Sequence, residues 1–250
     1  MVKSAKYRAP ALEKGLDILE LLARAHGSLN MTEIAQRVGY SKGEIFRMLQ
    51  VLATRGYLER DERDASYTLS NHLFLLGMER PPLKGLAEAA LGVMHGLAEK
   101  VQSACHLVVP SQDQIVVIAR VDAPGDLGFV VRVGHRRPLA HSTSGLVLFA
   151  FQSDETQAHW LARMEAGDER FRRRRFVATA LHVREQGYAS RPSEAVDAVT
   201  DLSAPILQRG HAVATITIPF VARHPTVVSI PAAIRHLRDA VGEVSAALLG

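Results

Sequence analysis

The chain has 250 residues, of which 47% are hydrophobic and 22% are charged, and its formal net charge at pH 7 is +4. This composition excludes wholesale disorder, and the length is sufficient for one large domain or two modest ones. The mild basic excess permits an anionic partner but does not require one, because solubility alone favours some net charge.

The cysteine content and the distribution of apolar residues indicate a cellular location. Cys105 is the only cysteine, so no intrachain disulfide can form and a reducing compartment is expected. No uninterrupted apolar run approaches the roughly 20 residues needed to cross a bilayer, and the first ten residues lack the apolar core of a signal peptide. We therefore expect a cytoplasmic protein with no membrane partner.

The first third of the chain predicts three helices followed by a β-hairpin. Apolar periodicity predicts the first helix over residues 11–24. Asn30 with Glu33, and Ser41 with Glu44, form capping boxes that predict the starts of the next two helices. The third helix has an apolar stripe at i, i+3, i+4 and i+7, formed by Ile45, Met48, Leu49 and Leu52. The hairpin is predicted from two short apolar stretches, 57–60 and 67–70, joined by the charged segment "DERDAS".

The remainder of the chain predicts helices and strands mixed along the sequence. The expected helices cover residues 84–101, 144–151, 154–165, 176–186 and 230–249. The expected strands cover residues 105–110, 114–121, 127–133, 197–207 and 210–220, the last two paired through a "QRG" turn. This order predicts an α+β domain with a largely antiparallel sheet.

Three helices and a hairpin within about seventy residues is the layout of a winged helix-turn-helix domain. The second helix of the turn then enters the major groove, where arginine and lysine bind phosphates or guanine and glutamine pairs with adenine. A glycine near the helix start permits close approach to DNA. The predicted DNA-binding residues are Ser41, Lys42, Gly43, Phe46, Arg47 and Gln50, with Arg63 added from the hairpin turn. The residues alone leave open a helical bundle with merely solvated charges, or a winged helix that serves as a protein-interaction adaptor.

The order of several motifs resembles the isocitrate-lyase-regulator (IclR) family of bacterial transcription regulators. In the first part the motifs are "LDILELLA", "TEIAQRVG" and "RGYLER". Beyond them "HLVVPSQDQIVVIARVDAP", "RVGHRRPLAHSTSG" and "GYASRPSEAVDAVTDLSAPIL" follow in the family's order. The resemblance implies a winged helix-turn-helix DNA-binding domain in residues 1–77, a linker helix region in 78–100 and a GAF-like effector-binding domain in 101–250. It also implies a homodimer or tetramer that binds double-stranded DNA at a roughly palindromic operator.

The resemblance further implies that three segments line an effector pocket. The implied residues are His141, Thr143, Ser144 and Gly145 from the first segment, Arg191, Val199 and Asp201 from the second, and Thr217 and Pro219 from the third. Hydroxyl groups, a helix start near Ser144 and an inward-pointing Arg191 would favour a carboxylate. The expected effector is therefore a small organic acid, aromatic acids included. The other reading of Arg191 is that it points to solvent, as most arginines do.

An enzyme is the rival class of function. His141, Ser142 and Ser144 are close in sequence and Asp201 could join them, so a hydrolase using His141 and Ser144 stays an alternative. No "GxSxG" motif supports a nucleophile elbow, and the histidines lack a metal-ligand spacing. We therefore expect no catalytic residue, no metal and no cofactor.

The segment "ERFRRRRF" at residues 169–176 is the most basic stretch of the chain. Phe171 and Phe176 bracket it and are expected to anchor it to the core, with most of the arginines solvated. Its position in the second domain indicates that it does not read the operator, although long-range electrostatic help or a subunit contact stays open. Cys105 is expected to be a buried apolar side chain, and its neighbour His106 a structural one.

Overall fold

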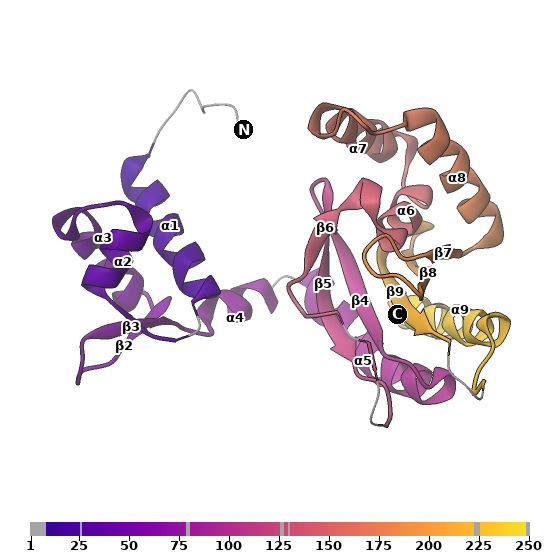
Figure 1. Ribbon diagram of the computed structural model, residues 1–250, viewed down its shortest axis with the longest axis horizontal. Helices are drawn as coiled ribbons and strands as arrows, with labels where there is room; N and C mark the ends of the chain where they lie inside the picture. The colour runs from indigo at the N-terminus through magenta and orange to yellow at the C-terminus, as the bar shows by residue number, and fades with distance from the viewer. Residues whose placement is uncertain are drawn as a thin grey trace. The chain divides into compact units, whose positions relative to one another are not determined.

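A computed structural model describes residues 9–25, 27–78, 81–125, 128–129, 131–222 and 226–248. The chain divides into two units, Met1–Leu83 and Lys84–Gly250. Figure 1 shows the helices and strands of both units. Among the described residues, none of the helices has the length and hydrophobicity that crossing a bilayer would require.

The first unit is the predicted arrangement of short helices and a hairpin. Its elements are α1 (Pro10–Arg24), β1 (Leu29–Asn30), α2 (Met31–Val38), α3 (Lys42–Thr54), β2 (Leu58–Arg60), β3 (Ser66–Leu69) and α4 (His72–Met78). The strands form a small antiparallel sheet in the order β1-β3-β2. Its fully buried side chains include Ile18, Ile34, Ile45 and Leu49, one or two from each of α1, α2 and α3. The winged helix-turn-helix layout is thereby confirmed.

Both predicted capping boxes are present. The Asn30 side chain accepts hydrogen bonds from the backbone N–H groups of Thr32 (2.9 Å) and Glu33 (3.1 Å), and the Glu33 carboxylate accepts one from the Asn30 N–H (2.8 Å). Ser41 and Glu44 repeat the arrangement at α3, where the Glu44 carboxylate accepts from the Ser41 N–H at 2.9 Å. Each box satisfies N–H groups that a helix start leaves unpaired, so the positions of α2 and α3 are set locally.

The second unit is built around one antiparallel sheet in the order β6-β5-β4-β9-β8-β7. Its strands are β4 (Cys105–Ser111), β5 (Gln114–Val121), β6 (Arg136–Pro138), β7 (Ala189–Pro192), β8 (Val199–Gln208) and β9 (His211–Val221). The predicted turn between β8 and β9 is confirmed. Arg209 (φ 51°) and Gly210 (φ 81°) both have left-handed backbone conformations, as a two-residue hairpin turn requires.

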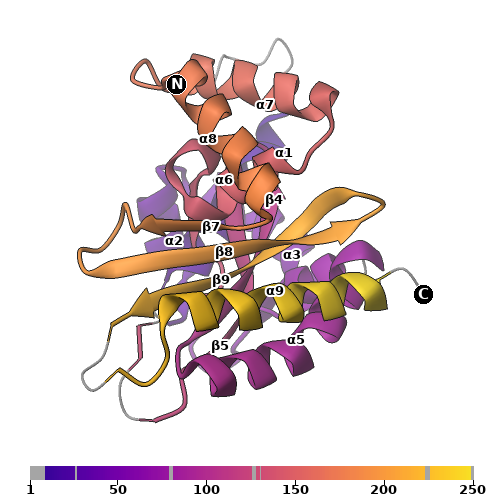
Figure 2. The same ribbon diagram turned by 90° about the vertical axis from the view of Figure 1, so that its right-hand side faces the viewer.

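Helices cover both faces of this sheet. They are α5 (Pro81–Val101), α6 (Thr143–Ala150), α7 (Asp154–Gly167), α8 (Arg173–Gln186) and α9 (Ile230–Ala247), with a short 3-10 turn η1 (Leu139–His141) before α6. The Cys105 thiol donates to the Met94 carbonyl of α5 at 3.5 Å, whereas His106 lines a cavity at the start of α6. Cys105 and His106 are successive residues of β4, so their side chains point to opposite faces of the sheet. Helix α5, which contacts Cys105, and helix α6, whose start lies near His106, are therefore on opposite sides of the sheet. Figure 2 shows α9 beside α5, and a groove between them is lined by both helices.

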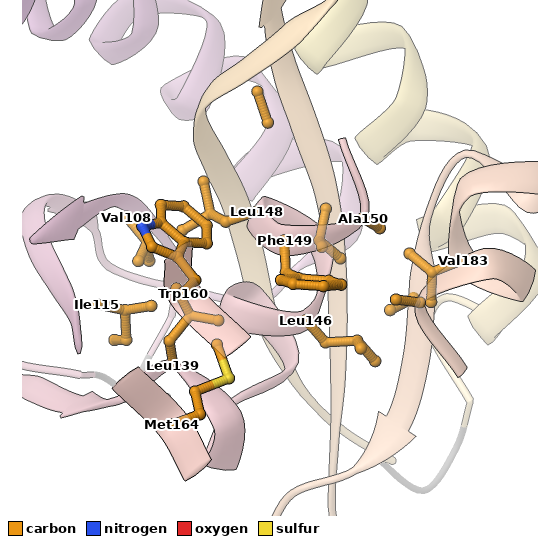
Figure 3. Packing of buried hydrophobic residues seen from close by; sticks show 14 of the residues in the cluster. Val108, Ile115, Leu139, Leu146, Leu148, Phe149, Ala150, Trp160, Met164 and Val183 are labelled. Carbon is orange, nitrogen blue, oxygen red and sulfur yellow. The ribbon is translucent and has the colours of Figure 1, made fainter. Parts of the chain in front are cut away.

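Helix α6 is the centre of the main core, and all eight of its residues are buried. Figure 3 shows Leu146, Leu148 and Phe149 of α6 among side chains from neighbouring elements, including Trp160 and Val183. An apolar helix surrounded on all sides is held by packing and not by an amphipathic stripe. The start of α6, which faces the sheet, is therefore fixed in position by its surroundings.

Three sequence predictions about this unit need correction. The strand expected over residues 127–133 is wrong for its described positions, which are irregular, while 127 and 130 lie outside the described residues. The strand that pairs with β5 on this side is β6. After the irregular segment, Gly134 and His135 form backbone hydrogen bonds with Val117 of β5. Helix α8 begins at Arg173 and not near residue 176, and α5 begins at Pro81, since proline fits the first turn of a helix.

Candidate nucleic-acid interface and effector cavity

Helix α3 presents one face to the core and the predicted reading face to solvent. Ile45 and Leu49 are fully buried and fix the rotation of the helix. All six residues predicted on the reading helix are exposed: Ser41, Lys42, Gly43, Phe46, Arg47 and Gln50. In the part of the chain that the structure describes, the side chains of Lys42, Arg47 and Gln50 have no hydrogen-bond or ion-pair partner. Their donors are therefore available to an external acceptor such as a base edge or a phosphate.

The start of α3 is tied to α1 by two polar contacts. Lys14 donates to the Glu44 carboxylate at 2.7 Å, and the Tyr40 hydroxyl donates to Asp17 at 2.7 Å. The Lys14 ammonium also neutralises the one carboxylate in the first turn of α3, which would otherwise repel DNA phosphates. The hydrogen bonds from Lys14 and then Ser41 lower the pKa of Glu44 to about 2.

We expect Glu44→Gln to change how the free energy of unfolding depends on pH. A lowered pKa means that the folded state favours the carboxylate, so this stabilisation is complete above pH 4.5 and is lost as the pH falls towards 2. The difference in urea-unfolding free energy between wild type and Glu44→Gln should therefore shrink over that range. Glu20→Gln, which removes an exposed carboxylate of α1, is the control. A difference that stays constant with pH would contradict the prediction.

The hairpin turn places Arg63 at its exposed tip. The Arg63 N–H donates to the Asp61 carboxylate at 2.8 Å, and the Ser66 N–H donates to Asp64 at 2.9 Å. The hydrogen bonds from Ser66 lower the pKa of Asp64. Two acidic residues beside Arg63 thus bind backbone donors of their own turn. Arg60, by contrast, lies over the Tyr67 ring with its guanidinium carbon 5.9 Å from the centroid.

The second unit contains a cavity of about 320 Å³ between the start of α6 and the sheet, called the effector cavity below. Its polar lining consists of His106, Arg132, His135, Arg137, Ser142, Thr143, Ser144, Ser193, Asp201 and Thr217, and its apolar lining includes Ile115, Val117, Phe129 and Val131. This volume falls within the range of small-molecule sites, about 300–1,000 Å³. Apolar walls with a few convergent polar groups are typical of such sites.

Several polar groups of the effector cavity are held in place by each other. The Ser142 hydroxyl caps α6 by accepting from the Gly145 N–H at 3.0 Å. The Thr143 hydroxyl donates to Asp201 at 3.4 Å, and on the sheet Thr217 shares a 2.8 Å hydrogen bond with Ser203. The cavity floor is therefore polar but largely paired, so a ligand would meet fixed hydroxyl groups.

Burial shifts the pKa of two groups in the cavity. It lowers the pKa of His106 to about 4, helped by the nearby charge of His135, so His106 is neutral at pH 7. Burial also raises the pKa of Asp201, against the opposing hydrogen bonds from Ser193 and Thr143 and the charge of Arg137. With two arginines and one carboxylate in the lining, the cavity favours an anionic ligand near its arginines.

The structure separates the predicted effector residues into three groups. Thr143, Ser144, Asp201 and Thr217 line the effector cavity. His141 and Arg191 line a different cavity of about 250 Å³. Gly145, Val199 and Pro219 line neither: Gly145 packs against η1, and the other two lie in the paired strands β8 and β9.

Sequence reasoning missed His106, His135 and Arg137 as cavity residues. The sequence predicts a structural role for His106, although this residue shares a strand face with Val108, which packs near α6. Arg137 lies in β6, which was not predicted, so its direction could not be inferred. The alternation along β4 was the available signal for His106.

The residues of the hydrolase alternative do not form a catalytic pair in this structure. His141 Nε2 lies 2.8 Å from Asp168 and Nδ1 lies 3.6 Å from Glu194, so both ring nitrogens face carboxylates. Among the described residues, no hydrogen bond joins His141 to Ser142 or Ser144, as a nucleophile and its base would require. Within the same residues, no three potential ligands cluster as a metal site would need.

Comparison with known proteins gives matches along both units. Residues 11–62 match the IclR helix-turn-helix domain, and residues 84–246 match the bacterial transcriptional regulator IclR C-terminal domain. The regulator KdgR of Dickeya chrysanthemi is 27% identical over 92% of this chain and 79% of its own length. The glycerol operon regulatory protein of Streptomyces coelicolor is 29% identical over 80% of this chain and 79% of its own length.

Solved structures share the fold. An IclR-type regulator from Alicyclobacillus acidocaldarius has a TM-score of 0.75 at 24% identity, covering 96% of this chain and 99% of that one. An IclR homologue from Microbacterium hydrocarbonoxydans, complexed with 4-hydroxybenzoate, has a TM-score of 0.77 at 19% identity, covering 95% of this chain and 98% of that one. Together, the domain matches over most of the chain show that this protein belongs to the IclR family of bacterial transcriptional regulators, with a DNA-binding helix-turn-helix domain and a C-terminal effector-binding domain.

Proposed function

We propose that this regulator binds an operator through α3 and that a small organic acid in the effector cavity controls this binding. DNA binding is assigned to residues 1–77, the linker to 78–100 and effector binding to 101–250. The observation that carries the DNA assignment is the exposed face of α3, whose donors have no partner within the described residues. Arg63 at the tip of the hairpin is suited to contact the adjoining phosphates.

The proposed effector follows from the lining of its cavity. Arg137 and Arg132 offer planar guanidinium groups for a carboxylate, and the start of α6 adds hydroxyl groups and a positive helix end. Phe129, together with Ile115 and Val117 of β5, forms an apolar wall, which suits the hydrocarbon part of an acid. The homologue complexed with 4-hydroxybenzoate supports including aromatic acids.

The proposed assembly is a homodimer, or a tetramer of dimers, on a roughly palindromic operator. Helix α4 exposes Leu73, Phe74 and Leu75, of which Phe74 is 66% accessible, and α1 exposes Leu12 at 63%. Several large apolar side chains exposed on one helix, as on α4, are typical of an interface between subunits. A two-fold dimer would place its two reading helices about 34 Å apart, one turn of DNA, or a multiple of that. The proposal includes a cytoplasmic location and a role as a regulator without enzymatic activity, supported by the regulators to which the chain is similar.

The test combines DNA retention with ligand binding. The protein should retain the DNA upstream of its own gene in a gel shift, and retention should fall steeply with salt concentration. A panel of small organic acids that includes 4-hydroxybenzoate should contain at least one that raises the melting temperature and alters retention. Absence of sequence-specific retention would favour the adaptor alternative and contradict the proposal.

Arg137→Ala is expected to weaken binding of the active acid by about tenfold or more, because a hydrogen bond to a charged group contributes about 1.5–3 kcal/mol. Arg136→Ala is the matched control: Arg136 is the preceding residue, is exposed and bonds to Gln114 at 2.9 Å outside the cavity. Calorimetric titration of both variants gives the two affinities. Equal affinities would place the acid elsewhere.

A further inference from the structure

A second cavity, called the arginine cavity below, lies in the effector-binding unit and shares no lining residue with the effector cavity. Its volume is about 250 Å³, and it is bounded by η1, the loop before α8, the first turns of α8 and β7. Four arginines line it: Arg170, Arg172, Arg175 and Arg191. Three of them come from the basic segment at residues 169–176.

The carboxylates near the arginine cavity do not balance its guanidinium groups. Glu194 is the one acidic residue in the lining among the described residues, and it already accepts from Arg191 at 3.3 Å and lies 3.6 Å from His141. Asp168, just outside the lining, lies 2.8 Å from His141 and accepts from the Arg170 N–H at 2.9 Å, so two carboxylates face four arginines and a histidine. Within the described parts of the chain, the Arg172 side chain donates only to the backbone carbonyls of Glu169 (3.2 Å) and Phe171 (3.4 Å). The Arg175 guanidinium has no hydrogen-bond or ion-pair partner among the described residues. The cavity therefore holds unneutralised positive charge that an anion would satisfy.

The inner wall of the arginine cavity is apolar and ordered by aromatic packing. The rings of Phe171 and Phe176 lie 5.3 Å apart between centroids, and Phe176 also packs on Phe149 of the core at 5.0 Å. Leu146 of α6 completes this wall. A site with basic groups on its rim and flat apolar groups within it suits a small organic molecule more than a bare ion or the outer surface of a DNA backbone.

The first turn of α8 shows why an anion would be stabilised there. The N-terminal end of a helix carries partial positive charge and favours acidic residues, as in α7, where Ser153 caps the helix and Asp154 follows. Helix α8 instead begins with Arg173, Arg174 and Arg175 and has no side-chain cap. This local conflict between charge and helix end adds to the positive potential of the cavity, and such conflicts are typical of functional positions.

We propose that the arginine cavity binds a phosphate monoester dianion, with its phosphate at Arg172 and Arg175 and its organic part against Phe171 and Phe176. The three phosphate oxygens match the several guanidinium donors better than a monocarboxylate does. The regulator would then have a second ligand site, separate from the effector cavity. This inference does not depend on the organic acid proposed above.

The test uses phenyl phosphate and inorganic phosphate as probes, titrated calorimetrically into the full-length protein at constant ionic strength. We expect phenyl phosphate to bind at least tenfold more tightly than inorganic phosphate, and Phe171→Ala to reduce this preference. Arg175→Gln should weaken phenyl phosphate binding by at least tenfold. Arg174→Gln is the matched control, because Arg174 belongs to the same helical turn and is exposed but does not line the cavity. It should change the affinity by less than twofold.

The outcomes separate this site from its alternatives. Equal losses of phenyl phosphate affinity in Arg175→Gln and Arg174→Gln would show diffuse electrostatic attraction and overturn the proposal. Failure of wild type to bind phenyl phosphate, with operator binding weakened in Arg175→Gln, would show that the arginines serve DNA and would also overturn it. Arg137→Ala should leave phenyl phosphate binding intact, so failure of the effector proposal does not affect this test. Circular dichroism of each variant verifies that it is folded.

Discussion

Replacing Arg47 with alanine is expected to weaken operator binding by about 5- to 150-fold, corresponding to the roughly 1–3 kcal/mol of a base-edge contact. Arg47 lies on the exposed face of α3, and its guanidinium has no partner among the described residues. Ile45 and Leu49 hold the helix from the opposite face, so the truncation should not disturb the fold. Fluorescence anisotropy with the operator and a scrambled duplex of equal length measures both affinity and discrimination.

The control for Arg47→Ala is Arg24→Ala, which removes the same charge from the end of α1. Arg24 is exposed and pairs with Glu20 at 3.1 Å, so its loss should have little effect on either duplex. The wild-type ratio of operator to scrambled affinity should fall in Arg47→Ala alone. If both variants lose affinity equally for both duplexes, Arg47 contributes only net charge and α3 is not the reading helix.

Gly145→Ala is expected to destabilise the effector-binding unit by at least about 1–3 kcal/mol, the usual cost of overpacking a core. A β-carbon at Gly145 would lie 2.2 Å from the Leu139 carbonyl oxygen and 2.6 Å from the Ser142 hydroxyl. Backbone must therefore move, and with it the start of α6 that carries Thr143 and Ser144 into the effector cavity. The melting temperature should fall by roughly 2–12 °C for a unit of this size.

Gly242→Ala is the matched control for this substitution. Gly242 lies within α9, and a β-carbon there would meet no atom within 4 Å. Alanine in an open helical position should stabilise the protein by about 0.4–1 kcal/mol. Opposite signs for the two substitutions are expected in thermal unfolding. A neutral Gly145→Ala would mean that η1 can move away without cost, and that the start of α6 is less constrained than its packing indicates.

The three helices and the hairpin of the first unit were predictable because their determinants are local, whereas β1 and α4 were not predicted. Asn30 and Ser41 mark helix starts by short-range hydrogen bonds, and the periodicity of Ile45 and Leu49 fixes which face of α3 is buried. Exposure of Arg47 follows directly from that periodicity. These signals each span fewer than about ten residues, so no knowledge of the distant chain was needed.

The cavities were not predictable to the same degree, because each one gathers residues from distant segments. His106, Arg137 and Asp201 meet only when β4, β6 and β8 are placed in the sheet. The strand over 127–133 was predicted from the apolar residues of that segment, but the strand that pairs with β5 is β6. Arg191 was expected beside Thr143, but β7 places it at the arginine cavity. Local patterns identify such residues as polar and partly buried without showing which cavity they share.

The pairing of β4 with β9 has a consequence for the synthesis of the protein. His106 pairs with Thr217, so 217 − 106 = 111 residues separate the partners at the middle of the sheet. At a translation rate of about 5–20 residues per second, β9 is synthesised roughly 6–22 s after β4, and the two strands cannot pair before then. The helix-turn-helix unit forms its contacts over shorter separations, such as Leu29 with Tyr67, and can fold during that interval. A nascent chain would then have a folded helix-turn-helix unit while its effector-binding unit is still unfolded. During this time the apolar strand β4 would be accessible to chaperones on the ribosome.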